Sequence, residues 1–124
     1  MIKLILFAGT GSFIGGALRF IISNATGKTS AGFPQGTFIV NIAGCLVIGL
    51  LYGLIDRNQT ISAEWRTLLT VGFCGGFTTF STFANENLAL LKGGNIAMFA
   101  FYTALSIFLG IMAVWAGNMI VKNC

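Results

Sequence analysis

The amino-acid sequence predicts an all-α membrane protein with four transmembrane helices in a single domain, residues 1–124. Of the 124 residues, 56% are hydrophobic and 8% are charged, whereas soluble proteins contain roughly 25% charged residues. Four apolar stretches each reach the length of about 20 residues that a helix needs to cross a bilayer. They cover residues 4–22, 33–55, 68–91 and 96–121. Turn-forming and charged residues fill the connections, so no separate soluble domain is expected.

The first stretch follows Lys3 and has the layout of a secretory signal. Three further spans and the lack of a small-residue cleavage site favour its retention as a membrane helix. Arg19 lies near its end. Its side chain either extends to the lipid headgroups or lies inside the protein in a functional role, and both interpretations are open.

The second stretch carries an amide at membrane depth. Pro34 is expected in its first helical turn, where the missing N–H costs nothing. Asn41 lies eight residues into the stretch, and lipid cannot satisfy its amide, so we expect it to face protein or water. Thr37 lies one turn earlier on the same face. A structural hydrogen bond between helices and a place in a functional site are equally compatible with this spacing.

The third stretch contains the densest polar pattern. Residues 75–83 combine paired glycines, four hydroxyl side chains and three phenylalanines. The glycines predict a break in the helix between Gly75 and Thr79 at mid-membrane, which is tolerated only inside protein or beside a watery cavity. Carbonyls freed by such a break suit a small hard cation. The ring edges of Phe80 and Phe83 suit an anion, although a core stripe and hydroxyls bonded back to their own helix are the simpler alternatives.

Lysines and arginines show only a weak bias toward one side of the membrane. Four on one side oppose two on the other: Lys3, Arg57, Arg66 and Lys122 against Lys28 and Lys92. Because such bias sets orientation, a weak bias predicts insertion both ways up and pairing of opposite copies. The net charge of +4 is spread over loops, so no nucleic-acid partner is expected.

The sequence contains few residues that could carry out enzymatic catalysis. Histidine is absent, which removes the commonest general base and metal ligand. The three cysteines have no metal-ligand spacing, and Glu86 is the only acid inside a span. Glycine pairs four apart predict close helix packing rather than sites. These pairs are Gly11 and Gly15, Gly49 and Gly53, and Gly72 and Gly76.

These residues resemble the Fluc family of fluoride channels, also called CrcB, over essentially the full length. The resemblance rests on Arg19 late in the first span, on the Gly-x-x-x-Val-Asn-x-x-Gly pattern of residues 36–44, and on the Gly-Phe-Cys-Gly-Gly-Phe-Thr-Thr-Phe-Ser-Thr-Phe run of residues 72–83. It implies an antiparallel dual-topology homodimer in the bacterial inner membrane. It also implies passive export of toxic cytoplasmic fluoride and a structural sodium ion at the dimer interface.

The resemblance also implies roles for single residues. Gly75 and Thr78 are expected to offer backbone carbonyls to sodium, and Phe80 and Phe83 to line the pores. Asn41 is expected to donate to fluoride. The remaining polar positions expected along the fluoride pathway are Ser81, Thr82, Thr37, Glu86, Tyr102 and Ser106.

Two other classes of protein are alternatives to a channel. A small multidrug-type, proton-coupled exporter also has four short spans, but it depends on an acid in its first helix, where this chain has only Arg19 after Lys3. An accessory protein that only packs against partners does not account for hydroxyls, an amide and paired glycines gathered at mid-depth. The channel is therefore the favoured hypothesis.

Overall fold

The computed structural model describes residues 1–124 and consists of helices and their connections. Four helices are long and apolar enough to cross a membrane, which confirms the predicted all-helical class with four spans. Three of them are continuous: α1 (Ile2–Thr26), α2 (Gln35–Arg57) and α6 (Ile96–Lys122). The span Ala63–Lys92 is composed of α3 (Ala63–Thr67), η1 (Leu68–Cys74), α4 (Gly75–Phe77) and α5 (Phe80–Lys92).

The helix α2 begins at Gln35, two residues after the predicted start at residue 33. Pro34 is not in the first helical turn: it precedes the helix with φ −77° and ψ 74°. Its carbonyl already accepts the Phe38 N–H at 3.1 Å. Pro34 therefore acts as the N-cap residue, where its fixed φ is equally well tolerated and no N–H donor is required.

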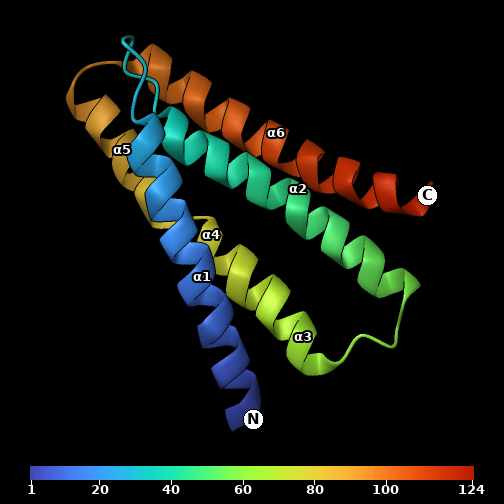
Figure 1. The fold of residues 1–124 in the computed structure, drawn as a ribbon. Coiled ribbons are helices and arrows are strands. Elements are labelled where there is room, and N and C mark those ends of the chain that lie inside the picture. The colour runs from blue at the N-terminus through green and yellow to red at the C-terminus, as the bar shows by residue number, and fades with distance from the viewer.

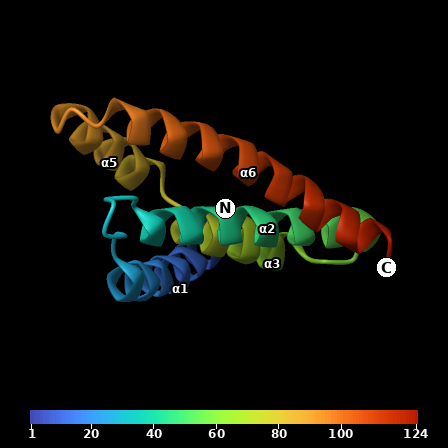
Figure 2. The ribbon, with the colours of Figure 1, turned by 90° about the horizontal axis from the view of Figure 1, so that it is seen from above.

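The helices form two parallel pairs. In Figure 1, α1 runs alongside α3 and α4, while α2 and α6 run in the same direction; Figure 2 shows that α6 approaches α2 toward its C-terminal end. Figure 2 shows α5 turned away from α3 and lying beside the first part of α6. At the far end of the second pair, Arg57 Nη1 donates to the carbonyls of Val121 at 2.7 Å and Cys124 at 2.9 Å. This contact joins the C-terminal ends of α2 and α6.

Glycines set the close approach within both pairs, as predicted. A Cβ atom at Gly11 would lie 2.7 Å from the Phe73 nitrogen, and one at Gly15 would lie 2.9 Å from the Phe77 nitrogen. In the other pair, a Cβ atom at Gly49 would overlap the Val114 carbonyl. Only residues without a side chain allow backbones to meet at these distances. The glycine pairs are therefore confirmed as packing positions.

The backbone leaves the helical path after Phe77. Thr78 has φ −91° and ψ 160°, and Thr79 has φ −149° and ψ 121°, so both residues are extended. The expected departure at Gly75 is wrong, because Gly75 is helical with φ −62° and ψ −38°. A Cβ atom at Gly76 would lie 2.6 Å from the Ser12 carbonyl oxygen of α1. At Gly76 a glycine is required for contact with α1, and the two following threonines carry the change in direction.

Candidate functional site

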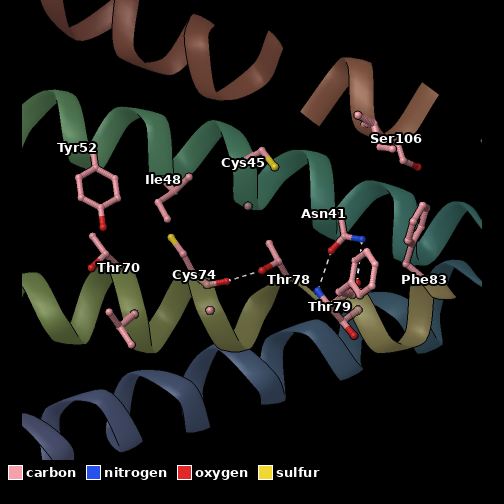
Figure 3. Close-up of a pocket in the computed structure, with 15 residues that line it drawn as sticks. Asn41, Cys45, Ile48, Tyr52, Thr70, Cys74, Thr78, Thr79, Phe83 and Ser106 are labelled. Carbon is pink, nitrogen blue, oxygen red and sulfur yellow. Dashed lines mark hydrogen bonds between the residues drawn. The ribbon is translucent and has the colours of Figure 1, made fainter. Parts of the chain in front are cut away.

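The side-chain amide of Asn41 holds the extended segment (Figure 3). Its Nδ2 donates to the Thr79 carbonyl at 3.1 Å, and the Thr79 N–H donates to its Oδ1 at 2.8 Å. An extended segment lacks the hydrogen bonds of a helix, and lipid offers no replacement. Asn41 thus supplies from α2 the donor and the acceptor that the Thr79 backbone needs. One N–H of the Asn41 amide is left without a protein partner.

Thr79 also begins the helix α5. Its Oγ1 accepts the Thr82 N–H at 3.2 Å, which is a side-chain N-cap, and donates to the Thr82 hydroxyl at 3.1 Å. The Ser81 hydroxyl lies 3.4 Å from the same oxygen. Ser81 and Thr82 are exposed. The hydroxyls therefore form a small exposed cluster at the first turn of α5, and only Thr78 bonds back to its own helix, at the Cys74 carbonyl, 2.9 Å away.

The extended segment changes the partners of nearby carbonyls. In a continuous helix the Thr79 N–H would bond to the Gly75 carbonyl, but here it bonds to Asn41. The Thr82 N–H would likewise bond to the Thr78 carbonyl, but here it bonds to Thr79 Oγ1. The carbonyls of Gly75 and Thr78 thus lose their usual helical donors. The Gly76 carbonyl accepts instead from Arg19 Nε at 2.9 Å.

The two phenylalanines of α5 have different surroundings. Their ring centroids are 5.8 Å apart. Phe83 is 8% exposed and its ring lies 5.0 Å from that of Tyr102 on α6, whereas Phe80 is 78% exposed. In the single chain, therefore, one ring belongs to the interior and the other projects from the protein.

Glu86 joins three helices through its carboxyl group. The Thr37 hydroxyl of α2 donates to Oε2 at 2.7 Å, and the Tyr102 hydroxyl of α6 donates to Oε1 at 2.8 Å. Thr37 and Tyr102 are 4% and 0% exposed. Both hydroxyl hydrogens are therefore engaged by Glu86, and neither is free to bond an anion in this arrangement.

A cavity of about 620 Å³ lies between α2, η1 and the first turn of α5, and is bounded by α6 (Figure 3). The predicted site residues on its lining are Asn41, Gly75, Thr78, Phe80, Phe83 and Ser106. The Ser106 hydroxyl is buried and has no hydrogen-bond partner. The other predicted positions, Thr37, Ser81, Thr82, Glu86 and Tyr102, do not line this cavity. The structure thus brings six of the eleven predicted residues together on one cavity, and Glu86 with its two hydroxyl partners does not line it.

Thr79 lines the cavity but is not among the residues predicted for the site. Threonine is a preferred N-cap residue, so a helix start at residue 80 is the signal that could have marked Thr79. Asn87 Oδ1 and Thr103 Oγ1 are buried without partners. No sequence pattern marks these two, because their burial depends on how α5 and α6 pack.

No group of three or more His, Cys, Asp or Glu side chains is placed to hold a metal ion. Cys74 is 2% exposed and lines the cavity with Cys45. Both cysteines are free. The oxygen atoms available to a hard cation near the extended segment are therefore backbone carbonyls and hydroxyls.

Four apolar spans around an interior of amides, hydroxyls and one carboxyl group define a multi-pass membrane protein. Residues 6–118 match the family described as CrcB-like protein, Camphor Resistance (CrcB). The protein belongs to this family.

Curated relatives match the chain over nearly its whole length. One from Flavobacterium psychrophilum is 41% identical over 122 residues, which cover 98% of each chain. One from Bacteroides fragilis is 47% identical over 120 residues, which cover 94% of each chain. One from Pseudomonas fluorescens is 43% identical over 123 residues, which cover 98% of this chain and 99% of the relative. Each is named fluoride-specific ion channel FluC, a channel and not an enzyme.

Proposed function

We propose that this protein is a fluoride-selective ion channel that allows toxic fluoride to leave the cytoplasm passively. The observation that carries the proposal is the bond of the Asn41 amide to the Thr79 backbone, which places non-helical backbone next to hydroxyls and aromatic edges within one span of a membrane protein. The names of the relatives support fluoride as the ion. Family membership and this polar site point to the same class of function.

The polar site belongs at mid-membrane in this proposal. Thr78 and Thr79 lie near the middle of the 30-residue span Ala63–Lys92, so similar lengths of helix precede and follow them. Non-helical backbone at that depth needs protein or water around it. The third span is then a broken helix whose interruption faces the ion pathway.

An antiparallel homodimer with dual topology completes the site. Phe80, Ser81, Thr82 and Gly75 are all exposed in the single chain. Hydroxyls near mid-depth are poorly placed against lipid, which cannot hydrogen-bond to them. A second copy in the opposite orientation would cover them, and the weak bias of lysine and arginine allows that orientation. Reporters fused to either terminus should be found on both sides of the membrane; reporters confined to one side would exclude dual topology.

A structural sodium ion is proposed at the carbonyls of Gly75 and Thr78. These carbonyls have lost their usual helical donors, and both residues line the cavity. Sodium is a hard cation that takes oxygen ligands, so the chemistry of the available atoms fits it. Once bound, the ion would supply positive charge to the interface. The chain's own part is to fix the two carbonyls through Asn41 and the Thr79 cap.

Fluoride is small and strongly hydrated, so a pathway must replace its water with donors that are already in position. The second N–H of Asn41 and the hydroxyls of Ser81, Thr82 and Ser106 are the donors proposed here. The edges of Phe80 and Phe83 carry partial positive charge and can face the anion. A path narrow enough for these contacts would exclude larger halides.

Glu86 is proposed to control two further donors. The hydroxyls of Thr37 and Tyr102 become available to an anion only if the Glu86 carboxyl group moves away. A fixed carboxylate at this place would also repel an anion. We therefore propose that the Glu86 side chain shifts when fluoride passes.

The proposal is tested by fluoride efflux from liposomes that contain the purified protein, followed with a fluoride electrode. Fluoride release should be fast, and chloride release under the same gradient should not exceed that of empty liposomes. Equal release of both ions, or fluoride release no faster than from empty liposomes, would contradict a selective channel. Proton-driven transport of hydrophobic cations would instead support the exporter, for which the comparisons give no support.

A further inference from the structure

We infer that Arg19 is a positioning residue, which replaces a backbone hydrogen bond that the extended segment removes from the end of α4. Arg19 Nε donates to the Gly76 carbonyl at 2.9 Å, across from α1. Arg19 is half-buried, and this is its only hydrogen bond to the protein. The role in ion flow rests on the proposed function, whereas the hydrogen bond itself does not.

The Gly76 carbonyl needs this donor for a geometric reason. In a continuous helix it would accept the Phe80 N–H four residues later. The extended residues Thr78 and Thr79 separate Phe80 from that position. A half-buried carbonyl without a donor is unfavourable in a protein that lies in lipid. Arg19 supplies the donor that the backbone no longer provides.

The packing around this bond leaves α1 and α4 little room to move relative to each other. A Cβ atom at Gly76 would lie 2.6 Å from the Ser12 carbonyl and 3.2 Å from the Gly16 nitrogen, so α1 and α4 are in backbone contact there. One turn of helix earlier, the Ser12 hydroxyl donates to the Gly72 carbonyl at 3.4 Å. Arg19 lies seven residues after Ser12, on the same face of α1. The two side chains thus bond successive carbonyls along one line of the third span.

This bond holds the last turn of α4, two residues before the extended segment begins at Thr78. Gly76 follows Gly75 and precedes Thr78 by two positions, and both of those residues line the cavity. Asn41 holds the segment from α2, and Arg19 holds the end of α4 from α1. The extended segment is therefore held on both sides by side chains from different helices, and Arg19 acts on the pathway through the backbone.

Two substitutions separate the donor from the charge. In Arg19→Gln, Nε2 is as many bonds from Cα as the arginine Nε, so an N–H remains while the positive charge is lost. In Arg19→Met, an unbranched chain of similar length carries neither. If the hydrogen bond matters, the glutamine variant should behave as the wild type. If only the charge matters, both variants should be equally impaired.

The direct measurement is the carbonyl chemical shift of Gly76. Labelling glycine with ¹³C at the carbonyl and phenylalanine with ¹⁵N selects the Gly-Phe pairs, which are Gly32–Phe33, Gly72–Phe73 and Gly76–Phe77. In the full-length protein, Arg19→Met should move the Gly76 signal and leave that of Gly32 unchanged. Arg19→Gln should leave the Gly76 signal near its wild-type position. An unmoved Gly76 signal in the methionine variant would overturn the inference.

Fluoride efflux provides the second measurement. We expect Arg19→Met to lower the rate by about tenfold or more and Arg19→Gln to keep it within about threefold of wild type. Glutamine and methionine variants that are equally slow would overturn the inference. If the methionine variant does not fold, the test rests on the glutamine variant alone. A shifted Gly76 carbonyl signal together with lost fluoride efflux in Arg19→Gln would then contradict the positioning role. Absence of efflux from the wild type would refute the proposed channel while leaving the carbonyl-shift result valid.

Discussion

Asn41 on α2 forms two hydrogen bonds with the backbone of a single residue, Thr79, which lies 38 positions later in the chain. Asn41 Nδ2 donates to the Thr79 carbonyl, and Asn41 Oδ1 accepts from the Thr79 N–H. The amide therefore satisfies an extended residue as a neighbouring β-strand would. This relationship explains how the non-helical backbone within the third span is stabilised by a side chain of the second span.

Replacing Asn41 with leucine removes both bonds and leaves a backbone N–H and carbonyl unpaired. Each unpaired group costs about 1–3 kcal/mol, so Asn41→Leu should lower both the stability in detergent and fluoride efflux. Asn118→Leu is the matched control, because Asn118 makes one long bond, 3.4 Å, to the Gly49 carbonyl. Thermal unfolding and electrode efflux measure the two effects. Wild-type stability in Asn41→Leu would show that the amide does not hold the segment.

Phe80→Ile and Phe83→Ile should separate permeation from packing. Phe80 is 78% exposed in the single chain, so its loss should change the chain's stability by no more than about 0.5 kcal/mol. Phe83 is 8% exposed, so Phe83→Ile should lower the free energy of unfolding by about 1–3 kcal/mol. Both substitutions remove polarised ring edges and should slow fluoride efflux by about three- to tenfold. An unchanged efflux rate in Phe80→Ile would count against its aromatic role.

The four spans and the glycine contacts could be predicted because the bilayer imposes them locally. Length and apolarity decide where a helix crosses, and close helix approach requires small residues. The place where the third span leaves its helix could not be predicted from the glycines. Gly75 is helical, and the extended residues are Thr78 and Thr79, whose conformation depends on an amide from a different helix.

The hydrogen-bond partners of the polar side chains could not be predicted from the sequence either. Asn41 could be expected to need a partner, but not to bond to Thr79. Arg19 had two open interpretations, and the structure favours the interior one because its Nε reaches Gly76. Glu86 accepts hydrogen bonds from Thr37 and Tyr102, which lie 49 and 16 residues away in the sequence. Such contacts depend on how the helices pack, which no local pattern specifies.

Thr37→Val and Tyr102→Phe should be coupled through Glu86. Either single change leaves the carboxyl group with one hydroxyl donor, whereas the double change leaves it with neither. The double variant should therefore lose more stability than the two single losses added, by about 0.5–3 kcal/mol. A double-mutant cycle of unfolding free energies in detergent measures this coupling. Strict additivity would indicate that the two hydroxyls act independently.

Removal of sodium should act slowly if the proposed ion is enclosed between two copies. Liposomes that contain the protein are diluted into buffer with a large organic cation in place of sodium, and efflux is sampled over time. Activity should decline over the time needed for the proposed dimer to open, and not at the moment of dilution. An immediate and complete loss that reverses as quickly would contradict an enclosed structural ion at Gly75 and Thr78.

Gly76→Ala should be far more damaging than Gly9→Ala, although both glycines are helical. The added Cβ atom at Gly76 would lie 2.6 Å from the Ser12 oxygen and 2.9 Å from its Cα, and these backbone atoms can move only if α1 shifts. Such crowding costs about 1–3 kcal/mol and would also disturb the Arg19 bond. Gly9 has no atom within 4 Å of a Cβ position, so alanine there should be neutral or stabilise its helix by about 0.5–1 kcal/mol. Melting temperatures of the two variants in the same detergent test this difference, and equal melting temperatures would mean that the contact between α1 and α4 is looser than the structure indicates.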